Sequence, residues 1–303
     1  MHRVNKTIAV ILVNYNGLAV NDACITAILH SETTANVRII VVDNASEDGS
    51  LESIRKNFGD RVRILEAGYN SGFSHANNIG IDFALANGAD YVMLLNNDTV
   101  IEADAIELLL EAADKKGDSL CVPRIMYFNR PSRIWFGGGY VSRYTFNTKH
   151  IDEGREYVDS PPVIRKTEFA SGCCMLIPRK IINEVGKLDE SYFLYYEDAD
   201  YCARINEAGF SIYYVSGAVV YHKVSFSAGG KISRNGIYYT TRNRLYYVNK
   251  FFKRGKIFFY PYFIVNRTCY CISWLIGGKR DLVGICIKAI IDYFKNVTGS
   301  TEL

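Results

Sequence analysis

The sequence predicts an α/β protein in which a mostly parallel central sheet is flanked by helices. Short apolar runs alternate with amphipathic segments through residues 1–125, as in repeated β-α-β units. The apolar runs are nearly continuous, which is typical of strands that are covered on both faces. The 303 residues are 49% hydrophobic and 22% charged, so the composition excludes a disordered or collagen-like chain.

Each predicted element rests on its hydrophobic period. Apolar runs predict strands at residues 7–13, 37–42, 62–65, 91–95 and 120–122. The amphipathic segments between them predict helices at residues 19–29, 51–57, 75–86 and 103–115. Further along, we expect a strand at 174–177, a helix at 179–185, a helix from the acidic run 197–200 through 208, and a strand at 212–215. Residues 126–165, rich in Gly, Tyr and Arg, are expected to form an irregular insertion over the site.

Polar residues follow four of the predicted strands directly. They are Asn14-Tyr15-Asn16-Gly17, Asp43-Asn44-Ala45-Ser46, Asn70-Ser71-Gly72 and Asn96-Asn97-Asp98. Each turn alone is explained by the needs of turns and helix caps, but four in register indicate a ligand site at the carboxyl edge of the sheet. Because no GxGxxG follows the first strand and no GxxxxGK[ST] occurs, a dinucleotide-binding Rossmann fold and a P-loop NTPase are disfavoured.

The C-terminal section differs in charge from the rest of the chain. Residues 208–280 contain no Asp or Glu but twelve Lys or Arg, and 15 of the 40 aromatic residues lie within 238–294. This pattern suits a membrane surface or a nucleic acid, whereas the alternative is a bundle that packs its aromatic residues into its own core. Pro261 and the polar residues 266–268 interrupt the most apolar stretch, so no membrane span is expected. We divide the chain into a sheet domain at 1–230 and a helical, basic and aromatic section at 231–303.

The cysteines and the N-terminal residues indicate in which cellular compartment the protein is expected. Eight cysteines without a CxxC spacing indicate reduced thiols, and the apolar run 8–13 is too short for a signal peptide. We therefore expect a cytoplasmic protein, with the C-terminal section able to bind the inner face of the membrane.

Seven segments in order carry a resemblance to a known family. They are VILVNYNG, VVDNASEDGS, NSGFSHANNIGI, LLNNDT, FASGCCMLIPR, FLYYEDADYCARINEAGF and VVYH. Together they resemble family 2 glycosyltransferases of GT-A fold, and among these the rhamnosyltransferase-like members that build surface polysaccharides. The resemblance covers roughly residues 7–250. It implies an inverting transferase that moves a sugar from a dTDP- or UDP-linked donor to a lipid-linked or polysaccharide acceptor.

The resemblance implies a metal site at Asp98, which stands where the family's DxD motif has its last aspartate. A hard cation, Mg²⁺ or Mn²⁺, would bridge this carboxylate and the diphosphate of the donor. Asn96 replaces the first acid of that motif, and His222 resembles a late histidine that completes the metal site in several members. The alternatives are that Asp98 caps a helix starting near Ala103 and that His222 is structural.

The resemblance also implies a donor site. Asp43 would accept a hydrogen bond from the imide N–H of uracil or thymine, since a carboxylate is an acceptor only. Asn14, Asn70 and Gly72 would hold the base and ribose, with Gly72 permitting a close backbone approach. Asn78 would face the donor from the following helix or, alternatively, lie on the helix surface.

The sequence allows two interpretations of two arginines in the basic section. Arg242 and Arg244 would contact the diphosphate or a lipid phosphate, or they would form a solvated basic helix face.

Asp198 matches the aspartate of the family's Glu-Asp pair, which takes the proton from the acceptor hydroxyl. The neighbouring carboxylates of Glu197 and Asp200 would raise the pKa of one group towards a useful base. The alternative is an acidic helix start in which Asp200 pairs with Arg204.

The competing hypothesis for the whole chain is a non-catalytic protein, or a nucleic-acid or membrane-binding protein, on a glycosyltransferase-like fold. A nucleic-acid partner is not expected, because the acidic residues 1–207 would repel it and the four polar turns would have no role.

Overall fold

The computed structural model describes residues 6–223, 233–252 and 256–303. Over these residues, a ten-stranded sheet has the strand order β10-β12-β6-β11-β4-β1-β2-β3, with β5 beside β12 and β7 beside β6. Its strands are β1 (Thr7–Asn14), β2 (Asn36–Asp43), β3 (Val62–Glu66), β4 (Tyr91–Leu95), β5 (Thr99–Ile101), β6 (Leu120–Tyr127), β7 (Arg130–Phe136), β10 (Ile164–Thr167), β11 (Cys174–Pro178) and β12 (Ile212–His222). A separate two-stranded sheet pairs β8 (Gly139–Val141) with β9 (Thr148–His150).

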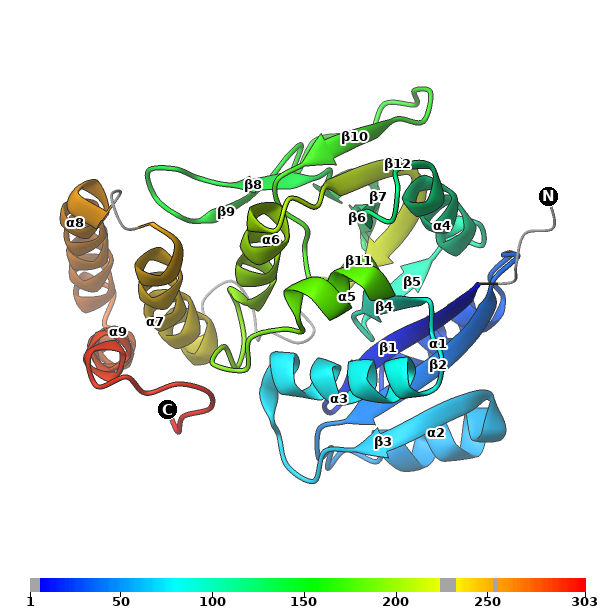
Figure 1. Ribbon diagram of the computed structural model, residues 1–303. Coiled ribbons are helices and arrows are strands. Elements are labelled where there is room, and N and C mark those ends of the chain that lie inside the picture. Colours follow the sequence, from blue (N-terminus) through cyan, green and yellow to red (C-terminus); the bar gives the residue numbers. More distant parts are fainter. Residues whose placement is uncertain (1–5, 224–232, 253–255) are drawn as a thin grey trace.

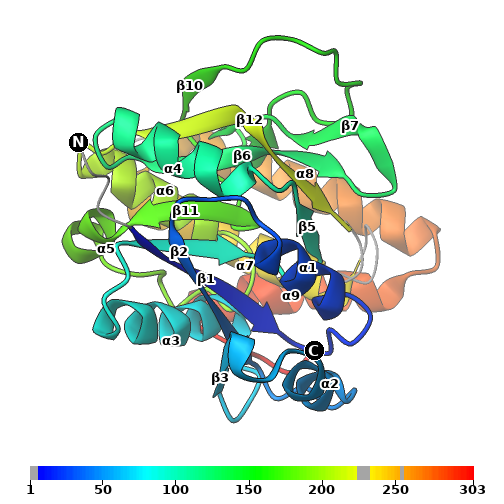
Figure 2. The same ribbon diagram turned by 90° about the vertical axis from the view of Figure 1, so that its right-hand side faces the viewer.

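The helices are arranged around the sheet as the sequence predicts (Figure 1). They are α1 (Asn21–Leu29), α2 (Ser50–Phe58), the 3-10 turn η1 (Gly59–Arg61), α3 (Gly72–Ala86), α4 (Ala105–Lys115), α5 (Arg179–Val185), α6 (Glu197–Glu207), α7 (Arg234–Phe251), α8 (Lys256–Ile276) and α9 (Arg280–Phe294). Helix α3 packs against β1 and β2, and α4 packs against β6 and β12 (Figure 2). The α/β fold class is therefore confirmed.

The sheet is parallel in its first half and mixed in its second. The strands β3, β2, β1 and β4 run parallel to one another, and β12 is parallel to β6. Strand β11, however, runs antiparallel between β4 and β6. The chain reaches β11 after a long excursion through β7 to β10 rather than through a single helical crossover, and an antiparallel neighbour needs no such crossover.

Two predicted strands are longer in the structure, and one expectation is wrong. Strand β6 extends to Tyr127 and β12 extends to His222, with a bulge between Val215 and Val219. Residues 126–165, expected to be irregular, contain β7, β8, β9 and the start of β10. These strands are short and carry polar or glycine residues, so they lack the apolar runs by which strands are recognised.

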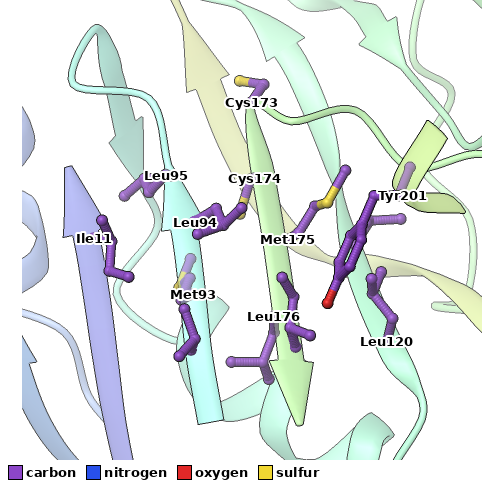
Figure 3. Close-up of a cluster of buried hydrophobic side chains, with 14 of the residues drawn as sticks. Ile11, Met93, Leu94, Leu95, Leu120, Cys173, Cys174, Met175, Leu176 and Tyr201 are labelled. Carbon is purple, nitrogen blue, oxygen red and sulfur yellow. The ribbon is translucent and has the colours of Figure 1, made fainter. Parts of the chain in front are cut away.

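The core lies between the central strands and the helices that cover them. Ile11 of β1, Met93 of β4, Leu176 of β11 and Leu120 of β6 are fully buried side by side (Figure 3). Tyr201 of α6 packs over this cluster. The strands that end at the polar turns are thus rigidly held by their own buried faces.

The C-terminal helices extend this core. Leu245 and Tyr247 of α7 and Phe259 of α8 are buried in the same cluster as the sheet, while α8 and α9 lie beyond α7, away from the sheet (Figure 1). The predicted domain boundary at 230/231 lies within 224–232, outside the described residues. Among the helices that the structure describes, none combines the length and the apolar character that a membrane crossing requires.

Candidate active site

Three strand ends are joined by a chain of buried amide hydrogen bonds. Asn14, at the end of β1, donates to Asp43 Oδ1 at 2.7 Å and accepts from Asn21 Nδ2 at 2.7 Å. Asn21 accepts from Asn97 Nδ2 at 2.8 Å. Gly17 makes room for this chain, because an added Cβ would lie 2.4 Å from Asn97 Nδ2. The carboxyl ends of β2, β1 and β4 therefore form one connected polar surface.

Asp43 is held with its carboxylate turned into this surface. Its second oxygen, Oδ2, accepts from the Ser46 backbone N–H at 3.1 Å, and the side chain is almost fully buried. A carboxylate has about four acceptor positions, so each oxygen retains a lone pair for a further donor. This geometry suits recognition of an N–H group of a ligand.

Asn44 organises the next turn. Its amide donates to Asn70 Oδ1 and to the Gly72 carbonyl, each at 3.2 Å, and its Oδ1 accepts from the Ser71 N–H and hydroxyl. The predicted residues Asn14, Asp43 and Asn70 are thereby brought to one edge of the sheet.

Asp98 and His222 face one another although they are far apart in sequence. The short strand β5 begins at Thr99 and pairs with the end of β12, so that Thr99 lies opposite His222. The Asp98 Oδ1 and His222 Nε2 atoms are 3.1 Å apart, and both side chains are buried. Because β5 separates Asp98 from α4, which begins at Ala105, Asp98 does not cap that helix.

The spacing of this pair fits a divalent cation. Two ligand atoms at right angles around Mg²⁺, each about 2.1 Å from the ion, lie about 3.0 Å apart. Among the described residues, no group of three or more His, Cys, Asp and Glu side chains is placed to hold a metal. Asp98 and His222 would therefore supply two ligands, and the substrate and water the others.

Aromatic rings shield the histidine of the pair. Trp135 of β7 stands edge-on to His222 with the ring centroids 4.7 Å apart, and His150 of β9 lies against the same indole at 4.6 Å. Burial lowers the pKa of His150. The insertion thus encloses one side of the site with uncharged, aromatic groups.

Helix α6 begins with the Glu-Asp pair after a strained turn. Tyr195 and Tyr196 both have positive φ values, 67° and 75°, which L residues rarely adopt in succession. The turn reverses the chain so that Glu197 and Asp198 start the helix. Burial, followed by the charge of Asp198, raises the pKa of Glu197 well above its ordinary value.

Asp198 is suited to accept a proton. Burial raises its pKa to about 6, although backbone hydrogen bonds lower it. Among these bonds, Gly172 N–H donates to Oδ2 at 3.2 Å and Ala199 N–H donates to Oδ1 at 2.8 Å. The carbonyl of Cys173, next to Gly172, accepts from the Asn96 N–H at 2.9 Å. Asp198 is therefore connected to the turn that carries Asp98 by two hydrogen bonds and the backbone of Gly172 and Cys173.

Asp200 has a different role from its neighbour. Its buried carboxylate accepts from Arg204 Nε at 2.7 Å and from Lys250 Nζ at 2.6 Å. The i,i+4 pairing of Asp200 with Arg204 is thus present, and Lys250 ties α6 to α7. Within the acidic start of α6, Asp200 therefore forms ion pairs that hold the helix in place, and Asp198 belongs to the candidate site.

Two residues expected to face the donor, Asn78 and Gly72, contact the segment before α6. Asn78 donates to the Leu188 carbonyl at 2.9 Å and to Glu190 at 2.8 Å, and it accepts from the Leu188 N–H. Gly72, with φ 82°, does allow a close approach, but to Phe193, because an added Cβ would lie 2.5 Å from the Phe193 carbonyl. The buried amide of Asn78 thus provides the hydrogen bond that the Leu188 carbonyl needs. The hydrophobic pattern of helix α3 does not predict this contact, because its partner lies in a distant loop.

The arginines of α7 are neither on a solvated face nor beside the strand-end turns. Arg242 is fully buried and donates to the Gly299 carbonyl at 2.9 Å and to Asn243 Oδ1 at 3.0 Å. Arg244 is buried between Phe259 and Phe263 of α8. Cation–π contacts compensate part of the cost of burying these charges, so we correct the assignment of Arg242 from ligand binding to internal packing.

Four residues of the site are absent from the sequence-based prediction. They are Asn21, Asn44, Asn97 and Trp135. Asn44 and Asn97 stand within the polar turns that drew attention to Asp43 and Asp98, so the signal was present. Asn21, at the start of a helix, is indistinguishable from a cap in the sequence.

The sequence matches glycosyl transferase family 2 over residues 9–186, which is more than half of the chain. The chain belongs to this family. The protein is therefore a glycosyltransferase, and the non-catalytic and nucleic-acid-binding alternatives are not favoured.

Curated relatives agree with this assignment. The low-salt glycan biosynthesis hexosyltransferase Agl10 of Haloferax volcanii is 24% identical over 90% of this chain and 88% of its own length. The N-acetylglucosaminyl-diphospho-decaprenol L-rhamnosyltransferase of Mycobacterium tuberculosis is 29% identical over 67% of this chain and 72% of its own. The dTDP-rhamnosyl transferase RfbF of Shigella flexneri is 22% identical over 73% and 70%. The predicted resemblance to rhamnosyltransferase-like members is confirmed.

Solved structures confirm the GT-A fold. GalNAc-T7, crystallised with UDP, GalNAc and Mn²⁺, superposes with a TM-score of 0.68 at 17% identity, over 85% of this chain and 50% of its own. S. aureus TarS superposes with a TM-score of 0.55 at 14% identity, over 82% and 41%. This chain thus spans half or less of these two solved chains.

Proposed function

We propose that the protein transfers a sugar, rhamnose or a similar hexose, with inversion from a dTDP- or UDP-linked donor to a lipid-linked or polysaccharide acceptor in cell-surface glycan synthesis. One observation carries this proposal: the Asp98–His222 pair, with ligand atoms 3.1 Å apart, is connected through Asn96, Cys173 and Gly172 to Asp198. A single displacement needs two elements: side chains that bind a metal ion, and a carboxylate of raised pKa that accepts a proton.

Each residue has a role in the proposed reaction. A bound Mg²⁺ or Mn²⁺, held by Asp98 and His222, would neutralise charge on the leaving diphosphate. Asp198 accepts the proton of the acceptor hydroxyl as its oxygen bonds to the anomeric carbon from the side opposite the nucleotide. The bond from that carbon to the phosphate oxygen breaks, and the electron pair leaves with the nucleoside diphosphate. Asp43 holds the base through its imide N–H.

The names of the relatives support the donor and acceptor classes. RfbF is named as a dTDP-rhamnosyl transferase, GalNAc-T7 was crystallised with UDP, and the mycobacterial relative is named for a decaprenol-linked acceptor. Uracil and thymine present the same imide N–H and differ at the carbon-5 methyl group, so Asp43 accepts either base.

Titration calorimetry with nucleoside diphosphates tests the donor class. We expect dTDP or UDP to bind in the presence of Mn²⁺ and CDP to bind at least tenfold more weakly, because cytosine has an acceptor nitrogen where uracil and thymine have the imide N–H. Asp43→Asn should weaken dTDP or UDP binding about 10- to 100-fold, because a charge-assisted hydrogen bond is lost and the new N–H₂ group meets the N–H donor of either Asn14 or Ser46.

Asp60→Asn provides the control, since Asp60 is exposed at η1. It should bind as the wild type does. Equal affinities for dTDP, UDP and CDP, or no effect of Asp43→Asn, would contradict the assignment of Asp43.

Helix α8 supports a membrane surface as a further partner. Its exposed apolar residues, spaced for one face of the helix, are Ile257, Phe258, Ile264, Val265, Ile272, Leu275 and Ile276. Phe258 is 79% exposed and Ile276 84% exposed, whereas Phe259, Phe263 and Trp274 on the other face are buried. Lys256, Lys279 and Arg280 lie at the two ends of the helix. We propose that this face lies in the head-group region of an anionic membrane.

Vesicle pelleting tests the membrane proposal. The wild type should pellet with phosphatidylglycerol-containing vesicles and less with phosphatidylcholine alone. The double variant Phe258→Glu, Ile276→Glu should lose about tenfold or more in vesicle affinity, because each burial of an apolar side chain contributes about 1.5–3 kcal/mol. Val158→Glu, a change at another exposed apolar residue, is the matched control. Unchanged pelleting of the double variant would exclude α8 as the membrane contact.

A further inference from the structure

The strained turn before α6 is held from two sides. The Tyr196 hydroxyl donates to the Phe146 carbonyl of the insertion at 3.0 Å. From the other side, Asn243 of α7 donates to the carbonyl of Leu194 at 2.9 Å and to that of Tyr195 at 2.8 Å. Two successive left-handed residues persist only where the surroundings fix them, so these contacts determine the conformation of the turn.

Asn243 is itself fixed in one orientation. The side chain is fully buried, and its Oδ1 accepts from Arg242 Nε at 3.0 Å. Because a carboxamide has one acceptor and one donor end, this bond directs both amide protons at the turn. Arg242 is held in turn by the Gly299 carbonyl and by the faces of Tyr238 and Tyr239.

We propose that Asn243 is a positioning residue for the transfer reaction, whose amide holds the Leu194 and Tyr195 carbonyls so that α6 presents Asp198 to the acceptor. The inference rests on the proposed function. It gives Arg242 a defined part, because Arg242 orients Asn243 and connects the turn to the C-terminal tail. Neither residue touches the reacting atoms.

The isosteric change Asn243→Asp separates this role from packing. The carboxylate keeps the shape of the amide and still accepts from Arg242, but it has no proton to donate to the two carbonyls. We expect kcat to fall about 10- to 100-fold, as displacements of about 1 Å in a catalytic group do, while the donor KM stays within about twofold. Hydrogen exchange of the amides in 194–199 should speed up in the same variant.

Tyr246→Phe is the matched control on the same helix. It removes one hydrogen bond, from the Tyr246 hydroxyl to the Val297 carbonyl, without touching the turn. It should keep the wild-type kcat and the wild-type exchange of 194–199. If Asn243→Asp does not fold, Arg242→Lys replaces it, since Lys keeps the charge but not the paired bonds to Asn243 and Gly299; it should lower kcat in the same direction.

The outcomes distinguish the two proposals. If the wild type transfers sugar and Asn243→Asp or its replacement is equally active with unchanged exchange, the positioning role is wrong and the proposed function stands. If the wild type transfers no sugar from dTDP- or UDP-linked donors, the proposed function is wrong. In that case the exchange of 194–199 still decides whether Asn243 holds the turn.

Discussion

Asp198→Asn is expected to reduce kcat for sugar transfer by about 10³- to 10⁴-fold, while the affinity for the nucleoside diphosphate stays within about twofold of the wild type. The amide keeps the size of the carboxyl group and its oxygen accepts one of the two N–H bonds, from Gly172 or from Ala199, but it is no base. A positioned general base contributes about 10²- to 10⁴-fold, and no other carboxylate occupies this position. Initial rates with a saturating donor and titration calorimetry with UDP or dTDP measure the two quantities.

The wild-type pH profile tests the same assignment. Asp198 acts as a base only when it is ionised, and burial raises its pKa to about 6. The rate should therefore fall tenfold per pH unit below about 6 and level off above it. A profile that is flat between pH 5 and pH 8 would contradict a role for Asp198 as the base.

Stability provides the control for Asp198→Asn. The folded protein binds the Asp198 proton more tightly than the unfolded chain, whose pKa is near the ordinary 3.8. The free energy of unfolding that this group contributes therefore falls as the pH rises from about 4 to about 6, and the cost persists above that range. Asn carries no such cost but accepts only one of the two N–H bonds. Because these two effects oppose each other, the melting temperature of the variant at pH 8 should stay close to that of the wild type. A large fall in melting temperature would mean that lost activity reflects unfolding.

Asp98→Ala is expected to reduce kcat/KM by about 100- to 1000-fold and to abolish the dependence of nucleotide binding on Mn²⁺. The carboxylate is the one anionic group of the Asp98–His222 pair, and a cation that stabilises the leaving diphosphate contributes several kcal/mol. His222→Ala should have a smaller effect, because the charged ligand remains and water can take the place of the imidazole. Rates at increasing Mn²⁺ concentration separate the two variants: higher Mn²⁺ restores His222→Ala but not Asp98→Ala.

Asp104→Ala is the matched control, since Asp104 is exposed in the same segment, at the start of α4. It should leave both the rate and its dependence on Mn²⁺ unchanged. If EDTA does not reduce transfer by the wild type, Asp98 and His222 do not hold an essential metal.

The sequence predicts those parts of the protein that depend on local patterns. The buried strands β1, β2 and β4 are nearly continuous apolar runs. The turns after them all carry Asn or Asp, which indicates a ligand site as well as ordinary turns. The resemblance to family 2 glycosyltransferases places Asp98, His222 and Asp198 among the candidates. The structure contains these strands and turns as predicted, because the buried faces of the strands fix the positions of the strand ends.

Long-range packing accounts for what the sequence does not predict. Asn78 and Arg242 are polar residues on helices, and only the folded chain shows that their partners are carbonyls of distant loops, at Leu188 and Gly299. The insertion was expected to be irregular because it is rich in Gly, Tyr and Arg, and strands of three residues such as β8 and β9 are too short to show a hydrophobic period. Hydrophobic period carries no information about such contacts, since they depend on which segments meet in space.

The pairing of β5 with β12 has a consequence for how the protein acquires activity during synthesis. Asp98 leaves the ribosome early, but its partner His222 is the last residue of β12 and arrives only when most of the chain has been made. Until β12 docks, the nascent chain has the polar turns of β1 to β4 without the second of the proposed metal ligands. Contacts of such large sequence separation form slowly. Premature termination before His222 therefore yields a product that has the polar turns but lacks one of the two proposed metal ligands, so a truncated chain would have no complete proposed site with which to consume donor sugar.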